Sequence, residues 1–163
     1  MPITQVVEAM PIESPAAFQV FHLSAPVLVP AGGIMKVPIF VFGLNAPLVK
    51  LTVSLHARLD GGALSLTLGS PDGTLTFLSA VDANGGLTLG ESRARPLVFD
   101  DDAERSIGES QAPFAGPHRP EQPLAAYRAP DRQVNGVWHL LLSGSGAGRA
   151  RTLVADAALV FRS

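Results

Sequence analysis

The sequence predicts an all-β protein, folded as an antiparallel β-sandwich of the jelly-roll kind. Apolar residues recur at every second position over short segments, and Gly, Pro, Asn and Asp separate these segments. No segment has the period of a long amphipathic helix. Several such strands with this punctuation favour two packed sheets over any helical fold.

Residues 49–56 form the clearest predicted strand. Val49, Leu51, Val53 and Leu55 alternate with polar residues, so we expect these four to face the core and the polar set to face outward. Residues 64–68 repeat the pattern with three leucines.

Turn signals connect the following strands. Ser70-Pro71-Asp72-Gly73 has Pro and Gly at the positions that a type I turn favours, which predicts a hairpin leading to the next alternating run, Leu75 and Phe77. Asn84-Gly85-Gly86 offers a second tight turn, because Asn and Gly tolerate positive φ.

A later strand is predicted around Trp138, which alternates with Leu140 and Leu142. This alternation favours a core position for Trp138 over an exposed binding platform. Residues 144–148, Gly-Ser-Gly-Ala-Gly, lack the Lys and the following helix of a phosphate loop, so they predict a flexible hairpin. Leu159 and Phe161 mark the last strand.

Residues 98–130 have little periodicity and are rich in Pro, Asp, Glu and Arg. We expect mostly irregular chain that crosses the end of the sandwich and has a role or a firm anchor. Asp102 could cap one helical turn over residues 103–105. Arg119 near Glu121 is either part of an interaction loop or a local anchor for this segment.

The composition excludes several functional classes. Charged residues are 16% of the 163 residues and the net charge is -2, so no broad basic face is available for nucleic acid. No apolar run approaches the roughly 20 residues of a membrane span, so we expect no membrane partner. The chain has no cysteine, which leaves the redox compartment open. The first residues lack the pattern of a secretory signal, which predicts cytoplasmic synthesis.

Several landmarks occur in the serial order of a known family. Phe99-Asp100-Asp101, the loop over residues 113–121 and Asn135-Gly136-Val137-Trp138 follow the strand and turn segments at 31–56 and 64–74. This order resembles the P domain, the β-sandwich that follows the catalytic domain of kexin- and furin-type proprotein convertases. The resemblance implies a P-domain-like sandwich over residues 29–163, preceded by an N-terminal extension over residues 1–28.

The chain also departs from that family. Residues 142–148 replace the aspartate and the Gly-Asp-x-Gly loop that P domains commonly have after the tryptophan strand, and Ala157 lies near the place of a second tryptophan. The 28 residues before the predicted sandwich are too few for a subtilisin-like catalytic domain, so we expect none in this chain. The resemblance therefore implies a fold rather than a protease.

The candidate chemistry is limited. Asp100, Asp101, Asp102 and Glu104 could bind calcium, as some P domains do, but a solvated loop with one capping aspartate is the ordinary alternative, and we expect no cofactor. The four histidines are scattered and no Gly-x-Ser-x-Gly motif is present, so we expect no enzymatic activity. Their positions are His22, His56, His118 and His139.

The N-terminal extension is apolar, and prolines make it a poor helix former. It could complete an edge of its own sandwich or lie along a neighbouring subunit as an added strand. We expect its apolar residues to form an interface. These are Ile3, Val6, Val7, Met10, Ile12 and Phe18.

These observations predict a non-catalytic structural or interaction subunit whose partners are protein subunits, in a homo-oligomer or a capsid-type lattice. A surface or decoration protein of a phage-type virion fits best, with the protein associated with that virion after synthesis. The alternative is an accessory P-domain module that binds or stabilises a separately encoded subtilisin-like protease. A hydrolase ranks last, because no nucleophile and base are recognisable.

Overall fold

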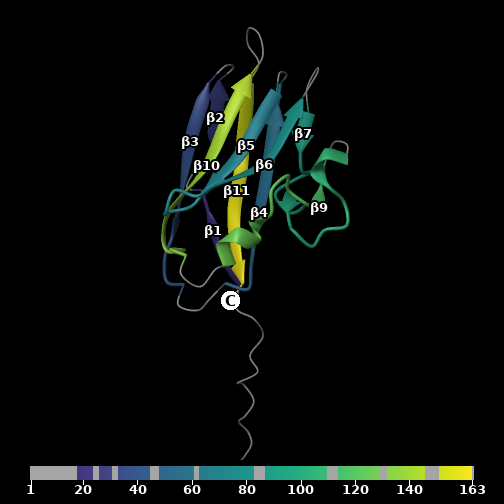
Figure 1. Ribbon diagram of the computed structural model, residues 1–163. Coiled ribbons are helices and arrows are strands. Elements are labelled where there is room, and N and C mark those ends of the chain that lie inside the picture. The colour runs from purple at the N-terminus through teal and green to yellow at the C-terminus, as the bar shows by residue number, and fades with distance from the viewer. Residues whose placement is uncertain are drawn as a thin grey trace, which may run out of the picture.

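The computed structural model of the chain is a sandwich of two β-sheets (Figure 1), as the sequence predicts. It describes residues 18–23, 26–30, 33–44, 48–60, 63–82, 87–109, 114–128, 132–145 and 151–162. The strands in these ranges are β1 (Phe18–His22), β2 (Val27–Pro30), β3 (Ile34–Val41), β4 (Lys50–Leu59), β5 (Ala63–Gly69), β6 (Leu75–Asp82), β7 (Leu87–Leu89), β8 (Leu97–Phe99), β9 (Gly116–His118), β10 (Gly136–Ser145) and β11 (Arg151–Arg162). The same ranges contain the 3-10 helices η2 (Ile107–Glu109) and η3 (Leu124–Arg128). Neither of these two helices is long and apolar enough to cross a membrane.

The larger sheet has seven strands and the smaller has four. The seven-stranded sheet has the order β1-β11-β4-β8-β9, with β2 also pairing with β11 and β7 with β4. The four-stranded sheet has the order β3-β10-β5-β6. The named strand pairs are antiparallel apart from β8 and β9, which are parallel.

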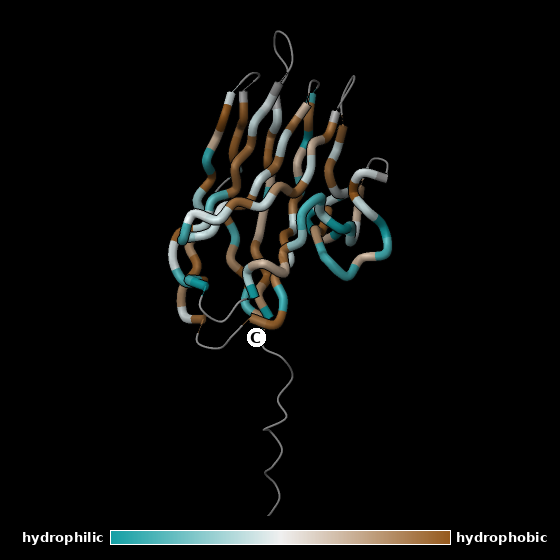
Figure 2. The backbone as a smooth tube through the Cα atoms, viewed as in Figure 1, coloured by the Kyte–Doolittle hydropathy of each residue, from teal (hydrophilic) through white to brown (hydrophobic). Residues whose placement is uncertain are grey.

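The predicted alternation is confirmed in β4, β5 and β10. Leu51, Val53 and Leu55 are buried in β4, and the leucines of β5 are buried in the same way. Val49 is the exception, because it precedes the first paired residue of β4 and remains exposed. Hydrophobic and polar segments alternate along the strands in Figure 2, while hydrophilic colour gathers around β9.

Trp138 occupies the centre of the core, which confirms the prediction from its alternation. Its side chain is fully buried, and its ring meets Tyr127 edge to face at 5.0 Å and Phe161 at 5.5 Å. The indole Nε1 donates a hydrogen bond of 2.8 Å to the carbonyl of Val134. Because Tyr127 comes from η3 and Phe161 from β11, this aromatic cluster joins three distant parts of the chain.

The turn after β5 forms the predicted hairpin with β6. The amide of Gly73 donates to the carbonyl of Ser70 at 3.0 Å, and Gly73 has a φ of 90°, which glycine adopts without strain. Ser70 and Thr74 donate hydrogen bonds to the Asp72 carboxylate, and Arg132 lies 3.3 Å from its other oxygen. The turn is thus fixed by side chains as well as by its backbone.

The two glycine-rich links, at residues 84–86 and 144–148, do not close hairpins between their flanking strands. The strands on either side of Asn84-Gly85-Gly86 belong to different sheets, since β6 pairs with β5 and β7 pairs with β4. The same holds for β10 and β11, on either side of residues 146–150. Residues 83–86 and 146–150 lie outside the described residues. Turn chemistry alone does not determine which sheet the next strand joins.

The segment from β8 to η3 runs along one side of the sandwich (Figure 1). β9 extends the seven-stranded sheet, and beyond it the amides of Glu121 and Gln122 donate to the carbonyls of Leu78 and Phe77 in the four-stranded sheet, at 2.9 and 3.0 Å. The segment is therefore anchored to both sheets. The helical turn predicted over residues 103–105 is wrong, because the 3-10 turn of this region lies at Ile107–Glu109.

Part of the expected extension belongs to the sandwich. β1 pairs along its length with the last residues of β11, and β2 pairs with the first residues of β11. Residues 18–28 thus contain β1 and the start of β2, within the seven-stranded sheet.

Candidate interaction surface

The residues predicted to form an interface fall into two groups. Ile3, Val6, Val7, Met10 and Ile12 lie outside the described residues. Phe18 begins β1, opposite Arg162, and its side chain is 65% exposed. A phenylalanine this exposed at the edge of a sheet is available for contact with another surface.

The outer side of the four-stranded sheet presents a second set of exposed apolar residues, which the sequence did not single out. Its inward positions, such as Ile39 and Trp138, are buried, so the alternating positions face outward. Ile34 is 78% exposed, Leu75 60% and Phe40 59%. We call this surface the outer apolar face; it consists of Ile34, Pro38, Phe40, Leu75, Phe77, Val137 and Leu141.

The strand register places the residues of the outer apolar face in neighbouring rows, in which His139, Gly69, Lys36 and Thr67 lie between them. Phe40 lies opposite Val137, and one step along the strands Pro38, His139, Gly69 and Leu75 form a row across all four strands. Lys36, Leu141, Thr67 and Phe77 form the next row. Neighbouring strands lie close enough for side chains in a row to touch.

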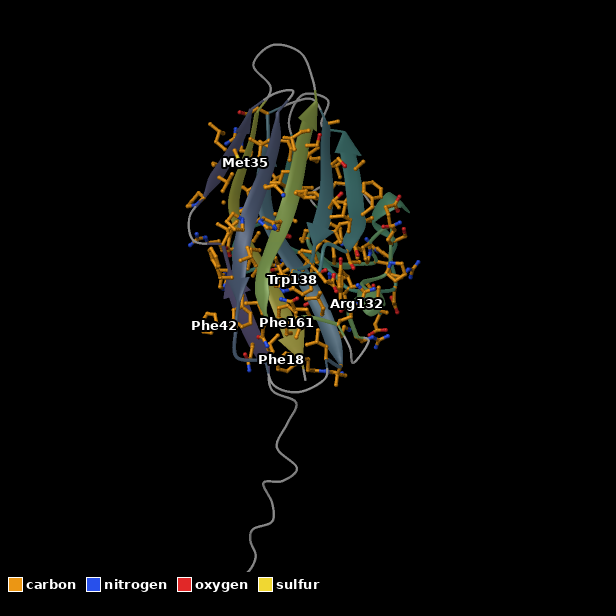
Figure 3. All side chains as sticks on the ribbon, turned by 60° about the vertical axis from the view of Figure 1, so that its left-hand side comes forward. Phe18, Met35, Phe42, Arg132, Trp138 and Phe161 are labelled. Carbon is orange, nitrogen blue, oxygen red and sulfur yellow. The ribbon has the colours of Figure 1, made fainter. Side chains whose placement is uncertain are left out.

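Charge is sparse on these strands. The charged residues of β3, β10, β5 and β6 are Lys36 and Asp82. Phe42, which follows the last residue of β3, is 72% exposed. The centroid of its ring lies 5.7 Å from that of Phe21 in β1, and Figure 3 labels both Phe42 and Phe18. A sheet surface with several exposed apolar residues and little charge is typical of a site of interaction with another molecule.

The sequence of β3 contains a pattern that indicates this exposed apolar face. β3 reads Ile-Met-Lys-Val-Pro-Ile-Phe-Val, with apolar residues at both even and odd positions. A strand of that kind places apolar side chains on both faces of its sheet, and only one of those faces can be turned toward the core.

The outer side of the seven-stranded sheet is different in character. Its outward positions include Lys50, Arg58, Asp156 and Arg162, and exposed apolar residues such as Leu153 lie among them. His22 Nδ1 lies 3.1 Å from the carboxylate of Asp156, and Arg58 lies 3.6 Å from Asp60. Charged groups thus interrupt the apolar surface on this side.

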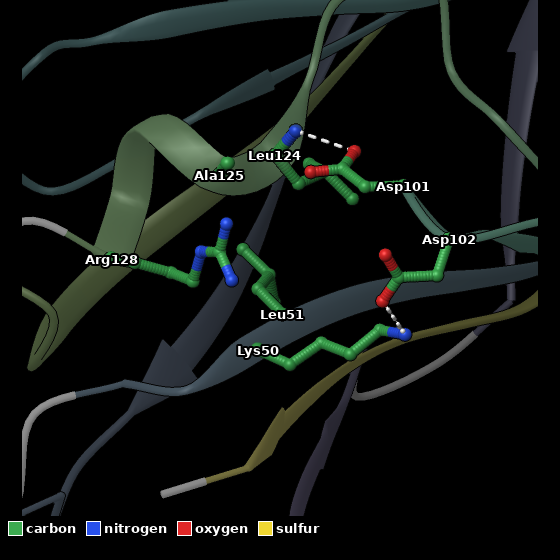
Figure 4. Close-up of a pocket in the computed structure, with 7 residues that line it drawn as sticks. All are labelled: Lys50, Leu51, Asp101, Asp102, Leu124, Ala125 and Arg128. Carbon is green, nitrogen blue, oxygen red and sulfur yellow. Dashed lines mark hydrogen bonds and ion pairs between the residues drawn. The ribbon is translucent and has the colours of Figure 1, made fainter.

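The acidic run makes contacts that hold the β8–η3 segment in place (Figure 4). The Lys50 ammonium lies 2.7 Å from both Asp100 and Asp102. Asp101 accepts a hydrogen bond of 2.9 Å from the amide of Leu124, at the start of η3. Asp102, predicted as a helix cap, is instead a partner of Lys50.

These contacts shift the ionisation of the groups involved. Burial disfavours the Lys50 ammonium, but hydrogen bonds and the charges of Asp100 and Asp102 outweigh it and raise the pKa of Lys50. The hydrogen bond from Lys50 and its charge lower the pKa of the Asp102 carboxyl. Among the described residues, no three His, Asp or Glu side chains come together in a way that could hold a metal ion. The ammonium lies where a cation would bridge Asp100 and Asp102.

Three histidines are bound to groups that fix their rings. His22 pairs with Asp156, while Nδ1 of His56 lies 3.3 Å from the carbonyl of Leu89 and Nδ1 of His118 lies 3.1 Å from that of Gly116. Arg119 donates to the carbonyls of Ala103 and Glu104 at 2.8 and 2.7 Å, so it anchors its own segment.

Neither a family model nor a curated protein sequence matches the chain. A chain in the structure of infectious bursal disease virus, Gt strain, is similar with 12% sequence identity and a TM-score of 0.37, over 97% of this chain and 36% of the viral chain. This chain thus spans about a third of the viral chain's length. A similarity of this size assigns no property to this protein, and the resemblance of the Phe99–Trp138 landmarks to P domains stays a prediction.

Proposed function

We propose that this protein is a non-catalytic structural subunit, which associates with protein partners through the outer apolar face. One observation carries the proposal: Ile34, Phe40 and Leu75 are more than half exposed on a sheet surface with little charge. Leaving such a surface in water is unfavourable, and a partner that covers it gains free energy in proportion to the apolar area buried.

The polar groups of the described residues support a structural role. The acidic run, Arg119 and three of the histidines are engaged in contacts that position loops and strands. These structural contacts explain why the polar side chains lie where they do, and no catalytic role is needed to explain their positions.

We further propose that the assembly is the surface of a phage-type virion, on which the protein is a surface or decoration subunit. A small, cysteine-free sandwich with one apolar face turned outward fits this role. Genes for capsid and tail proteins beside its own would support the proposal, whereas a neighbouring gene for a subtilisin-like protease would contradict it.

Sedimentation velocity over a range of concentrations tests the association. Phe40→Asp and Leu75→Asp are each expected to weaken self-association by at least about tenfold, because a carboxylate at an apolar contact must be desolvated. Leu153→Asp is the matched control, since Leu153 is an exposed apolar residue on the opposite sheet. A wild-type protein that stays monomeric at every concentration, or a control that weakens association equally, would contradict the proposed interface.

A further inference from the structure

We propose that the outer apolar face binds the N-terminal segment, residues 2–17, of a second copy of this protein. The inference rests on the proposed function, because it names the partner surface through which copies associate. The pairing would bury apolar residues of both surfaces in one contact and would link neighbouring copies.

The N-terminal segment has the composition that the face requires. It contains Ile3, Val6, Val7, Met10 and Ile12, and its prolines at positions 2, 11 and 15 disfavour a helix. An extended segment placed on a sheet surface can present alternate side chains to it.

The segment also carries charges opposite to that of Lys36. Residues 1–17 contain Glu8 and Glu13 and neither lysine nor arginine. Lys36 is exposed in the middle of β3, on the face that we assign to the segment. A carboxylate of the segment near Lys36 would favour this face and would fix the position of the segment along it.

The length of the segment and the place where it joins the fold fit this contact. The chain enters the sandwich at Phe18, in the strand whose Phe21 contacts Phe42, the residue that follows β3. β3 has 8 residues and is about 26 Å long. The sixteen residues 2–17, fully extended, span at most about 58 Å. The segment is thus more than long enough to cover the length of β3.

Engineered cysteines can test the contact in the full chain, because the natural sequence has no cysteine. One protein carries Val7→Cys, and a second, with a tag that changes its mass, carries Val137→Cys on the outer apolar face. The two are mixed and oxidised, and a disulfide between them requires the Cα atoms to approach within about 7 Å. We expect the mixed product between Val7→Cys and Val137→Cys to form readily.

The control is Leu153→Cys, an exposed apolar position on the opposite sheet, mixed in the same way with Val7→Cys. Its product is expected to be severalfold less abundant. Equal yields would overturn the inference, since the segment would then have no preferred face. A chain carrying both Val7→Cys and Val137→Cys that closes the disulfide within a monomer would also overturn it, in favour of the protein's own segment.

Association measurements separate this inference from the proposed function. Val6→Asp combined with Val7→Asp should weaken self-association about as much as Phe40→Asp, and the three changes together should weaken it no further, because they act on one contact. If the segment variant associates normally while Phe40→Asp does not, the inference fails and the proposed interface stands. If both variants associate normally, the two proposals fail together.

Discussion

On the outer side of the seven-stranded sheet, charged side chains lie among the apolar ones and pair with each other, as His22 does with Asp156. On the outer side of the four-stranded sheet, Ile34, Phe40 and Leu75 are exposed around Lys36. The two sheets share one core, so the requirements of folding apply to both inner sides alike. The difference on the outer sides is therefore informative about contacts beyond this chain.

The two sides of a single strand also differ in what they contact. In β10, Trp138 points inward and Val137 points outward, one residue away. If stability comes from the inner side and association from the outer side, substitutions at these neighbours must have separable effects. Unfolding measurements on the purified protein can test that separation.

Trp138→Ala should have the largest effect. It removes the centre of the aromatic cluster with Tyr127 and Phe161, and we expect a loss of about 3–5 kcal/mol in the free energy of unfolding. Urea denaturation measures the loss. Val137→Ala is the control and should change stability by no more than about 0.5 kcal/mol. Similar losses for both variants would contradict the separation, because the outer side of β10 would then contribute as much to stability as the inner side.

Tyr127→Phe should have the next largest effect. The Tyr127 hydroxyl bonds to the buried Thr76 Oγ1 at 2.6 Å and lies 3.3 Å from the carbonyls of Leu68 and Thr74. Without it these groups lose a buried partner, at a cost of about 1–3 kcal/mol. Denaturant unfolding of Tyr127→Phe, Thr76→Val and the double variant checks this. Fully additive losses would show that the two side chains are not coupled.

Asp72 should make stability depend on pH. Hydrogen bonds from Ser70 and Thr74, with Arg132 nearby, hold the pKa of the Asp72 carboxyl far below its ordinary value of 3.8. A lowered pKa in the folded state stabilises the protein above pH 3.8, and this stabilisation is lost as the pH falls below that value. Thermal melts of Asp72→Asn should therefore lose less stability on acidification than those of the wild type. Parallel losses in the two proteins would contradict this role.

Lys50→Met should have the smallest effect. It removes the ion pairs with Asp100 and Asp102, which lie at the surface and are screened by salt. We expect a slightly lower melting temperature at low salt, and a difference that shrinks near 1 M NaCl. A difference that persists in high salt would indicate that Lys50 acts through packing of its aliphatic chain.

Local patterns in the sequence predicted the sheets better than the connections between them. The leucines of β5 and the Trp138 strand alternate strictly, and periodicity alone placed them in the core. The crossings from β6 to β7 and from β10 to β11 were missed, because glycine-rich links are compatible both with hairpins and with a change of sheet. The anchors of the β8–η3 segment are backbone hydrogen bonds between distant residues, such as Glu121 and Leu78, which leave no periodic signal.

The outer apolar face shows a different limit. Leu75 and Phe77 alternate as residues of a buried face would, yet both point outward, while Thr76 and Ser79 are buried on the inner side. The period of two identifies which residues share a face but not which face meets the core. That choice depends on the packing of the whole sheet, including the irregularity in the β5–β6 register between Leu66 and Thr67.

The contact between β6 and the segment that follows β9 has a consequence for aggregation. A sheet edge with free amides and carbonyls invites strands of other molecules to pair with it, without limit to the number added. At Phe77 and Leu78 this edge is already occupied, by the main chain of Glu121 and Gln122 and by the Gln122 side chain, which accepts from the Phe77 amide at 2.8 Å. Copies that meet here cannot polymerise strand by strand at these residues. Contacts at these residues would have to be made by side chains, which do not extend a sheet.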